Sequence, residues 1–172
     1  MEATFFRVPE GRRRDFRCCY VPDSSGSLVD VSDQAGVFKT YTEDGLGYFS
    51  GSEGLVSSAA DFYRFASMLL NGGICPMTGR QVLSAGSVGE MTRNQMPGDT
   101  DMSGWPSASM MGLRPSGFGL GVSVAIRPNR SSTIGSGVGE YGWGGAANTH
   151  YFASPLDGNL LVLMFTQVLQ DP

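Results

Sequence analysis

Hydrophobic residues recur at helical spacing in residues 54–73, which run GLVSSAADFYRFASMLLNGG. The apolar positions that lie three or four apart are Phe62, Phe65, Ala66 and Leu69. This spacing places them on one face of an α-helix. Ser58 can cap the N-terminus, and Asp61 can close a capping box much as Glu would. Because Asn71-Gly72-Gly73 then supplies a stop signal, the segment predicts a helix that ends near residue 71.

Two shorter helices are predicted elsewhere. One begins after Ser84, a common type of N-cap, and runs to about Arg93. The other lies within residues 8–20, where Pro9 can open a helix although Gly11 weakens it. The next stretch, VPDSSGSLVDVSDQAGVF, is a loop that could hold one strand. A loop rich in Gly, Pro and Met follows the second helix and runs to about Ser116.

From residue 117 the hydrophobic period changes to that of strands. FGLGVSVAI alternates and is rich in β-branched residues, and YFAS and LLVLMFTQ flank a Pro-Leu-Asp-Gly-Asn turn. The pattern predicts an antiparallel meander of three strands, at residues 118–126, about 140–154 (bent at its glycines) and 160–167. We therefore expect an α+β fold.

These elements fit one domain, because 172 residues can bury a sizeable core. We expect residues 1–116 to form mainly helices and loops, and residues 117–168 to form antiparallel strands. The 25 glycines and the 16% of charged residues describe a turn-rich globular chain.

Charge and hydropathy exclude several classes of protein. A net charge of −4 argues against binding to nucleic acid or to an anionic membrane, which requires a basic face. The longest strongly apolar run, LLVLMF at 160–165, is far shorter than the roughly 20 residues of a membrane span. The N-terminus lacks the apolar core of a signal peptide, so we expect a cytoplasmic protein.

Metal and cofactor sites are not expected. The three cysteines, Cys18, Cys19 and Cys75, form neither a disulfide framework nor a metal-binding pattern, and His150 is the single histidine. The chain also lacks a Walker phosphate loop and a Gly-x-Ser-x-Gly nucleophile elbow. A Ser-His-Asp triad through His150 is possible in principle, but the spacing gives it no support, and a lone histidine on a strand is more often structural.

One stretch needs a separate explanation, YGWGGAANTHY at residues 141–151. Glycine weakens a strand interior and usually marks a bulge or the close approach of a ligand or another backbone. Residues 143–146 therefore form either a bend in a sheet or one wall of a site, and the residues alone leave both alternatives open.

Together, several segments resemble a known family. GLVSSAADFYRFASMLLNGG, EMTRNQMP, GFGLGVSV and YGWGGAANTHYFASPLDGNLLVLMFTQ follow, in order and spacing, the C-terminal half of serine β-lactamase-like hydrolases. This superfamily includes class C β-lactamases and penicillin-binding proteins, and the resemblance is strongest to its esterase branch, often called family eight carboxylesterases. It implies a β-lactamase/transpeptidase-like fold that is incomplete in this chain.

The resemblance also implies a site. In the family, the third active-site box is Lys-Thr-Gly in β-lactamases and often Trp-x-Gly or His-x-Gly in the esterases, which here corresponds to Trp143-Gly144-Gly145. The backbone N–H of Ala146 would then be one oxyanion donor, and Trp143 an apolar wall that favours esters. Tyr141 and His150, on either side of the box, would complete the substrate-binding residues.

The first two boxes of the family are missing from the chain. A Ser-x-x-Lys nucleophile box cannot exist, because Gly36 stands three residues before the single lysine, Lys39. Arginine cannot replace that lysine as a base, since it stays protonated. A Tyr-x-Asn box is absent as well. The chain is thus expected to be the C-terminal part of a longer serine hydrolase.

Two functions are compatible with this pattern. The first is ester hydrolysis through an acyl-serine, with a small acyl ester or β-lactam-like substrate and a nucleophile supplied from outside this chain. The second is a non-catalytic remnant that acts as a binding or assembly module. Because an incomplete fold would leave a strand edge open, we expect self-association or a partner chain that supplies the N-terminal half.

Overall fold

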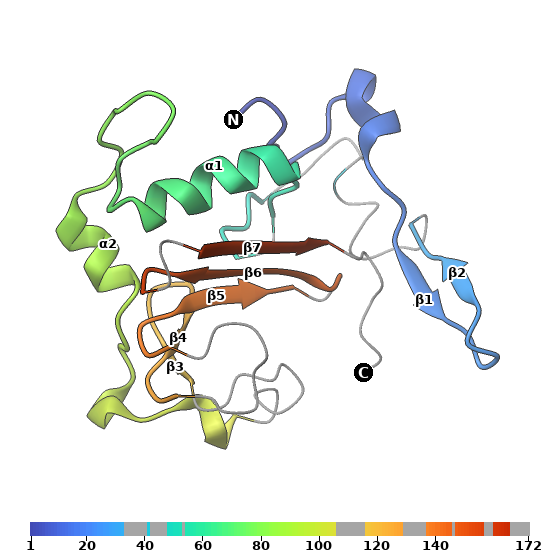
Figure 1. Ribbon diagram of the computed structural model, residues 1–172. Helices are drawn as coiled ribbons and strands as arrows, with labels where there is room; N and C mark the ends of the chain where they lie inside the picture. The colour runs from blue at the N-terminus through green and yellow to red at the C-terminus, as the bar shows by residue number, and fades with distance from the viewer. Residues whose placement is uncertain are drawn as a thin grey trace. The chain divides into compact units, whose positions relative to one another are not determined.

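The strands from Ser116 onward form one antiparallel sheet in the computed structural model of the protein (Figure 1). The structure describes residues 1–32, 41, 48–52, 54–105, 116–128, 137–145, 147–156 and 160–165. The strand order is β3-β4-β5-β6-β7, so each strand pairs with its neighbours in sequence. Their bounds are Ser116–Phe118, Ser123–Ala125, Tyr141–Gly144, Thr149–Ser154 and Leu160–Phe165. The mixture of helices and an antiparallel sheet confirms the α+β prediction.

The prediction of three strands in this region is wrong, because two of the predicted strands each reverse direction. Residues 118–126 contain the last residue of β3, a turn at Gly121, whose φ of 90° lies in the left-handed region, and the whole of β4. Residues 140–154 fold into the β5–β6 hairpin instead of a bent strand. Asn148 has a φ of 58° in its turn and donates its backbone N–H to the Gly145 carbonyl at 2.9 Å. The glycines and Asn148 thus end strands.

Helix α1, Ala59–Leu70, confirms the helix predicted from residues 54–73. Ser58 Oγ accepts a hydrogen bond from the backbone N–H of Asp61 at 3.2 Å, as an N-cap does. The Asp61 carboxylate, 2% exposed, accepts from the N–H of Ala3 at 2.7 Å and ties the N-terminal segment to the helix start. Gly72 and Gly73 both have positive φ and end the helix as expected.

Helix α2, Ala85–Met91, confirms the predicted helix after Ser84, whose Oγ accepts from the N–H of Ser87 at 3.0 Å. The prediction of a helix within residues 8–20 is only partly correct, because a 3-10 helix, η1, spans Glu10–Asp15. A hairpin of β1, Tyr20–Pro22, and β2, Leu28–Asp30, follows it. Two short 3-10 turns, η3 at Pro97–Asp99 and η4 at Met102–Gly104, interrupt the segment predicted as a loop.

By its contacts, the chain divides into two compact units. One comprises Met1–Phe62, Gly145–Thr149 and Phe165–Pro172, and the other comprises Tyr63–Gly144 and His150–Met164. The second unit contains a core in which side chains of α1 and α2 meet those of β4, β5 and β6. The buried members of this core are Met68, Leu69, Val88, Val122, Val124, Tyr141 and Ala153.

Gly119 fixes how closely the β3–β4 turn approaches the end of α2. A Cβ atom at Gly119 would overlap the carbonyl oxygen of Met91, which already accepts the N–H of Leu120 at 3.0 Å. We expect Gly119→Ala to lower the free energy of unfolding by about 1–3 kcal/mol, since the backbone must move. Gly89→Ala is the matched control, because a Cβ at this position in α2 meets nothing within 4 Å.

Gly89→Ala should raise the free energy of unfolding by about 0.5–1 kcal/mol, since alanine favours helix. Urea denaturation of both variants measures the difference. Equal stabilities for the two variants would contradict the close approach at Gly119.

Two core tyrosines predict a loss of stability at alkaline pH. Burial raises the pKa of Tyr141 to about 12, and burial, followed by the charge on Tyr141, raises the pKa of Tyr151. Their neutral forms are thus favoured in the folded state. Stability is complete below the unfolded pKa of about 10 and falls as pH rises through the folded value. The slope is about 1.4 kcal/mol per pH unit for each tyrosine that ionises only on unfolding.

Tyr141→Phe should remove part of this slope, and urea denaturation at about pH 8 and about pH 11 would measure it. Among the described residues, the Tyr141 hydroxyl has no hydrogen-bond partner. The substitution should therefore cost little stability at neutral pH. An unchanged alkaline slope in Tyr141→Phe would refute the assignment.

Candidate functional site

The backbone of β5 offers hydrogen-bonding groups on one side. The Glu140 carbonyl accepts from the N–H of Ala125 at 2.8 Å, and the Gly142 carbonyl accepts from Ser123 Oγ at 2.8 Å. The even-numbered residues thus turn their N–H and C=O groups toward β4, because these groups alternate in direction along a strand. The register with β4 ends at Ser123↔Gly142. Gly144, two residues on, faces the same side beyond the last β4 pair.

Strand β6 occupies the other side of β5. Trp143 pairs with Tyr151, and Gly144 pairs with His150. A Cβ atom at Gly144 would overlap the imidazole of His150, so only glycine leaves room for this ring. Close approach of the His150 side chain explains the glycine at this position.

The predicted box ends at the β5–β6 turn. Gly145 donates its N–H to the Thr149 carbonyl at 2.8 Å, which closes the hairpin. Ala146, the predicted oxyanion donor, lies outside the described residues. The structure therefore places Trp143 and Gly144 on β5 and Gly145 directly after it, and it brings His150 against Gly144.

Tyr141 has different surroundings from Trp143, Gly144 and His150. Its side chain is 3% exposed and belongs to the core formed with α1 and α2. Packing explains this tyrosine, and its burial gives no support to the prediction that it contacts a substrate.

Three aromatic rings stand next to one another at the predicted box. Trp143 contacts Phe118 of β3 edge to face, with ring centroids 4.9 Å apart and an interplanar angle of 77°. Phe118 in turn contacts Trp105, which follows η4, at 5.9 Å and 40°. We call Trp105, Phe118 and Trp143 the aromatic row. The sequence analysis missed Trp105 and Phe118, because no spacing rule connects a loop tryptophan to a strand.

Hydrogen bonds from the segment after α2 hold Phe118 in place. Asn94 Oδ1 accepts the N–H of Phe118 at 3.1 Å, and the N–H of Gln95 donates to the Phe118 carbonyl at 2.8 Å. A Cβ atom at Gly117 would overlap the Asn94 side chain. Both backbone groups of Phe118 are therefore held by residues 94 and 95, and the neighbouring glycine makes room for them.

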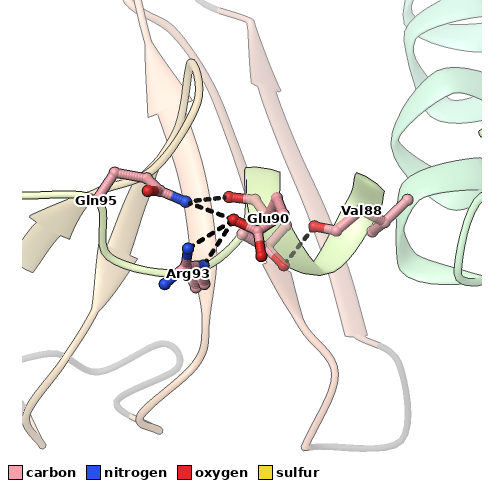
Figure 2. Close-up of polar contacts among 5 residues, drawn as sticks. Val88, Glu90, Arg93 and Gln95 are labelled. Atoms are coloured by element: carbon pink, nitrogen blue, oxygen red, sulfur yellow. Dashed lines mark hydrogen bonds and ion pairs between the residues drawn. The ribbon is translucent and has the colours of Figure 1, made fainter. Parts of the chain in front are cut away.

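The Glu90 side chain in turn organises that segment (Figure 2). Its carboxylate accepts from Arg93 Nε at 2.8 Å and from Gln95 Nε2 at 3.2 Å. The hydrogen bond from Arg93, followed by that from Gln95, lowers the pKa of Glu90. These groups are exposed, so the contacts orient the segment more than they stabilise the fold.

The described part of this site combines apolar rings with the backbone groups of Gly144, which face the β4 side of β5. Its nearby serine, Ser123, is buried and donates to the Gly142 carbonyl, so it serves the sheet. Such an arrangement can hold an apolar group on the rings while backbone groups at the strand edge bind a polar atom.

Comparison with known proteins identifies the fold. Simvastatin synthase (LovD) from Aspergillus terreus, in its LovD6 mutant, aligns over 96% of this chain with a TM-score of 0.72 and 19% sequence identity. EstCE1, a hydrolase with promiscuous acyltransferase activity, aligns over 97% with a TM-score of 0.65 and 18% identity. These proteins have the β-lactamase/transpeptidase fold. This chain shares that fold. It spans 41% of the first structure and 42% of the second.

Sequence relatives lie in Mycobacterium tuberculosis. Protein Rv1367c of strain H37Rv and the uncharacterized protein MT1414 of strain CDC 1551 are each 33% identical to this chain over 120 residues. The match covers 69% of this chain and 29% of each relative. No protein-family model matches the chain. Within the part of the chain that the structure describes, no helix is both long and apolar enough to cross a membrane.

The contact between Gly144 and His150 predicts a coupled effect on stability. Gly144→Ala should lower the free energy of unfolding by about 1–3 kcal/mol, because the new methyl group displaces the imidazole. In a His150→Ala background, the same substitution should cost much less. Urea denaturation of the two single variants and the double variant gives the coupling energy. Strictly additive effects would contradict the packing of His150 over Gly144.

Proposed function

We propose that this chain forms the substrate-edge and oxyanion part of a serine hydrolase or acyltransferase that acts on esters through an acyl-serine. The observation that carries the proposal is the orientation of Gly144, whose backbone groups face the side of β5 beyond its last pair with β4. The shared fold with a hydrolase and an acyl-transferring synthase supports it.

Each residue of the box then has a role in acyl transfer. The N–H of Ala146 is an oxyanion donor, which supports the negative charge that develops on the ester oxygen. Gly144 lets the substrate lie along the strand edge. Trp143 contributes an apolar wall, which favours an uncharged ester over a substrate with a carboxylate. His150 packs over Gly144 and positions the end of β5. The His150 side chain also contacts the substrate there.

The nucleophile comes from outside this chain. Ser-x-x-Lys requires a lysine, and Gly36 stands at the serine position relative to Lys39. The covalent step attaches the acyl group to that external serine and releases the alcohol, and water or a second alcohol then takes the acyl group.

A non-catalytic binding or assembly module is the second candidate, and the missing nucleophile box favours it. Both functions use the same strand edge. They differ in whether a serine is acylated by the ester once a nucleophile box is present.

Fluorophosphonate labelling separates these two functions. The purified 172-residue chain should show no adduct by intact mass and no hydrolysis of a short-chain p-nitrophenyl ester. Expression together with any coding sequence found directly upstream of Met1 should restore both, through a serine in Ser-x-x-Lys. A preceding reading frame without that box would favour the binding module. A single adduct on the isolated chain would show that one of its own serines is the nucleophile.

The oxyanion role of Ala146 is tested in the active, extended polypeptide. Ala146→Pro removes the backbone N–H and should lower kcat about 100-fold to 1,000-fold. Ala146→Gly keeps the N–H and serves as the matched control. Equal kcat values for the two variants would exclude Ala146 as a donor.

A further inference from the structure

The aromatic row differs from the core in its exposure. None of its three members belongs to the buried core of the second unit. Trp105 is 43% exposed, and Phe118 and Trp143 are each partly exposed. Burying the faces of such rings against an apolar ligand is favourable, because their area leaves water. The row is thus an apolar surface that is partly exposed to solvent.

Phe118, the middle residue of the row, is held by backbone hydrogen bonds and by ring contacts on both sides. Asn94 and Gln95 bind both backbone groups of Phe118, and Glu90 holds Gln95 in turn. Aromatic contacts at 4.9 and 5.9 Å on either side then set the neighbouring rings. The backbone hydrogen bonds and the two ring contacts together hold Phe118 without burying it fully, which suits a preformed binding surface.

The row starts at the residue next to the proposed ester site. Trp143 precedes Gly144 on β5, and Phe118 and Trp105 continue the row onto β3 and the segment after η4. An ester whose carbonyl lies at Gly144 can extend an apolar chain over Trp143 and Phe118 toward Trp105. Uncharged rings attract apolar groups and offer no cation to a carboxylate.

We propose that the aromatic row binds the apolar chain of the ester and makes medium-chain, uncharged esters the substrate class. Phe118 and Trp105 are then specificity-determining residues, and Asn94 is a positioning residue that acts through Phe118. This inference rests on the proposed function, because it places the ester carbonyl at Gly144.

The two tryptophans of the chain allow a direct test, since both Trp105 and Trp143 belong to the row. The isolated chain is titrated with methyl acetate, butanoate, hexanoate and octanoate while tryptophan fluorescence is recorded. Saturable changes are expected, with Kd falling about fourfold for each buried methylene until the row is covered.

Trp105→Ala should remove the gain in affinity for the longest esters, while Trp143 still reports binding. Trp105→Gln, a second variant of similar length, should do the same if the alanine variant does not fold. Tyr63→Ala is the matched control, because it removes a 54% exposed aromatic side chain of α1 and should leave the dependence on chain length intact.

Two outcomes would overturn the inference: no saturable change with any ester, or the same dependence on chain length in both Trp105 variants as in the unmodified chain. The proposed function is tested separately by labelling of the extended polypeptide. Length-dependent binding without labelling would refute the acyl-serine mechanism and keep the aromatic row as a binding surface. Labelling without a preference for chain length would refute the row alone.

Discussion

Close backbone packing at the glycines of β5 is the constraint on which this sheet and its site depend. A Cβ atom at Gly142 would overlap the carbonyl oxygen of Tyr151, and one at Gly144 would overlap the His150 ring. A side chain at residue 142 would therefore force the β6 backbone to move, and one at residue 144 would displace the His150 ring. The register of β5 with β6 turns the backbone groups of Gly144 away from β6.

A second close approach sets the aromatic side of the site. Gly117 and Gly119 allow the end of α2 and residues 91–95 to lie directly against β3 and its turn. Hydrogen bonds from Asn94 and Gln95 then hold Phe118 between the two tryptophans. The polar network around Glu90 is exposed and adds little stability, yet it aligns the residues that hold the ring. Contacts between segments distant in the sequence therefore fix the backbone of Phe118, and the two tryptophans contact its ring.

The proposed chemistry divides between this chain and sequence outside it. Under this proposal, the strand edge at Gly144 and the aromatic row of this chain bind and orient an ester. The proposal takes the serine and its base from outside this chain, because Gly36 stands three residues before the single lysine, Lys39. The relatives and fold neighbours are all more than twice as long as the part that this chain matches. Binding and chemistry can accordingly be tested one at a time.

Local patterns in the sequence determined the helices and the presence of antiparallel strands. Helices α1 and α2 were predicted with their serine caps, because capping and helical spacing depend on residues only three or four apart. The unusual glycines at 144 and 145 were also visible, as part of either a bend in a sheet or one wall of a site. The number of strands was not, because a glycine can bend a strand or end it, and pairing with a distant strand decides which.

Only the tertiary structure brought Asn94 to Phe118, 24 residues away, and Trp105 and Trp143 to the same ring. Contacts between residues so far apart in the sequence follow from how α2 packs on β3. A local hydrophobic pattern therefore cannot predict them.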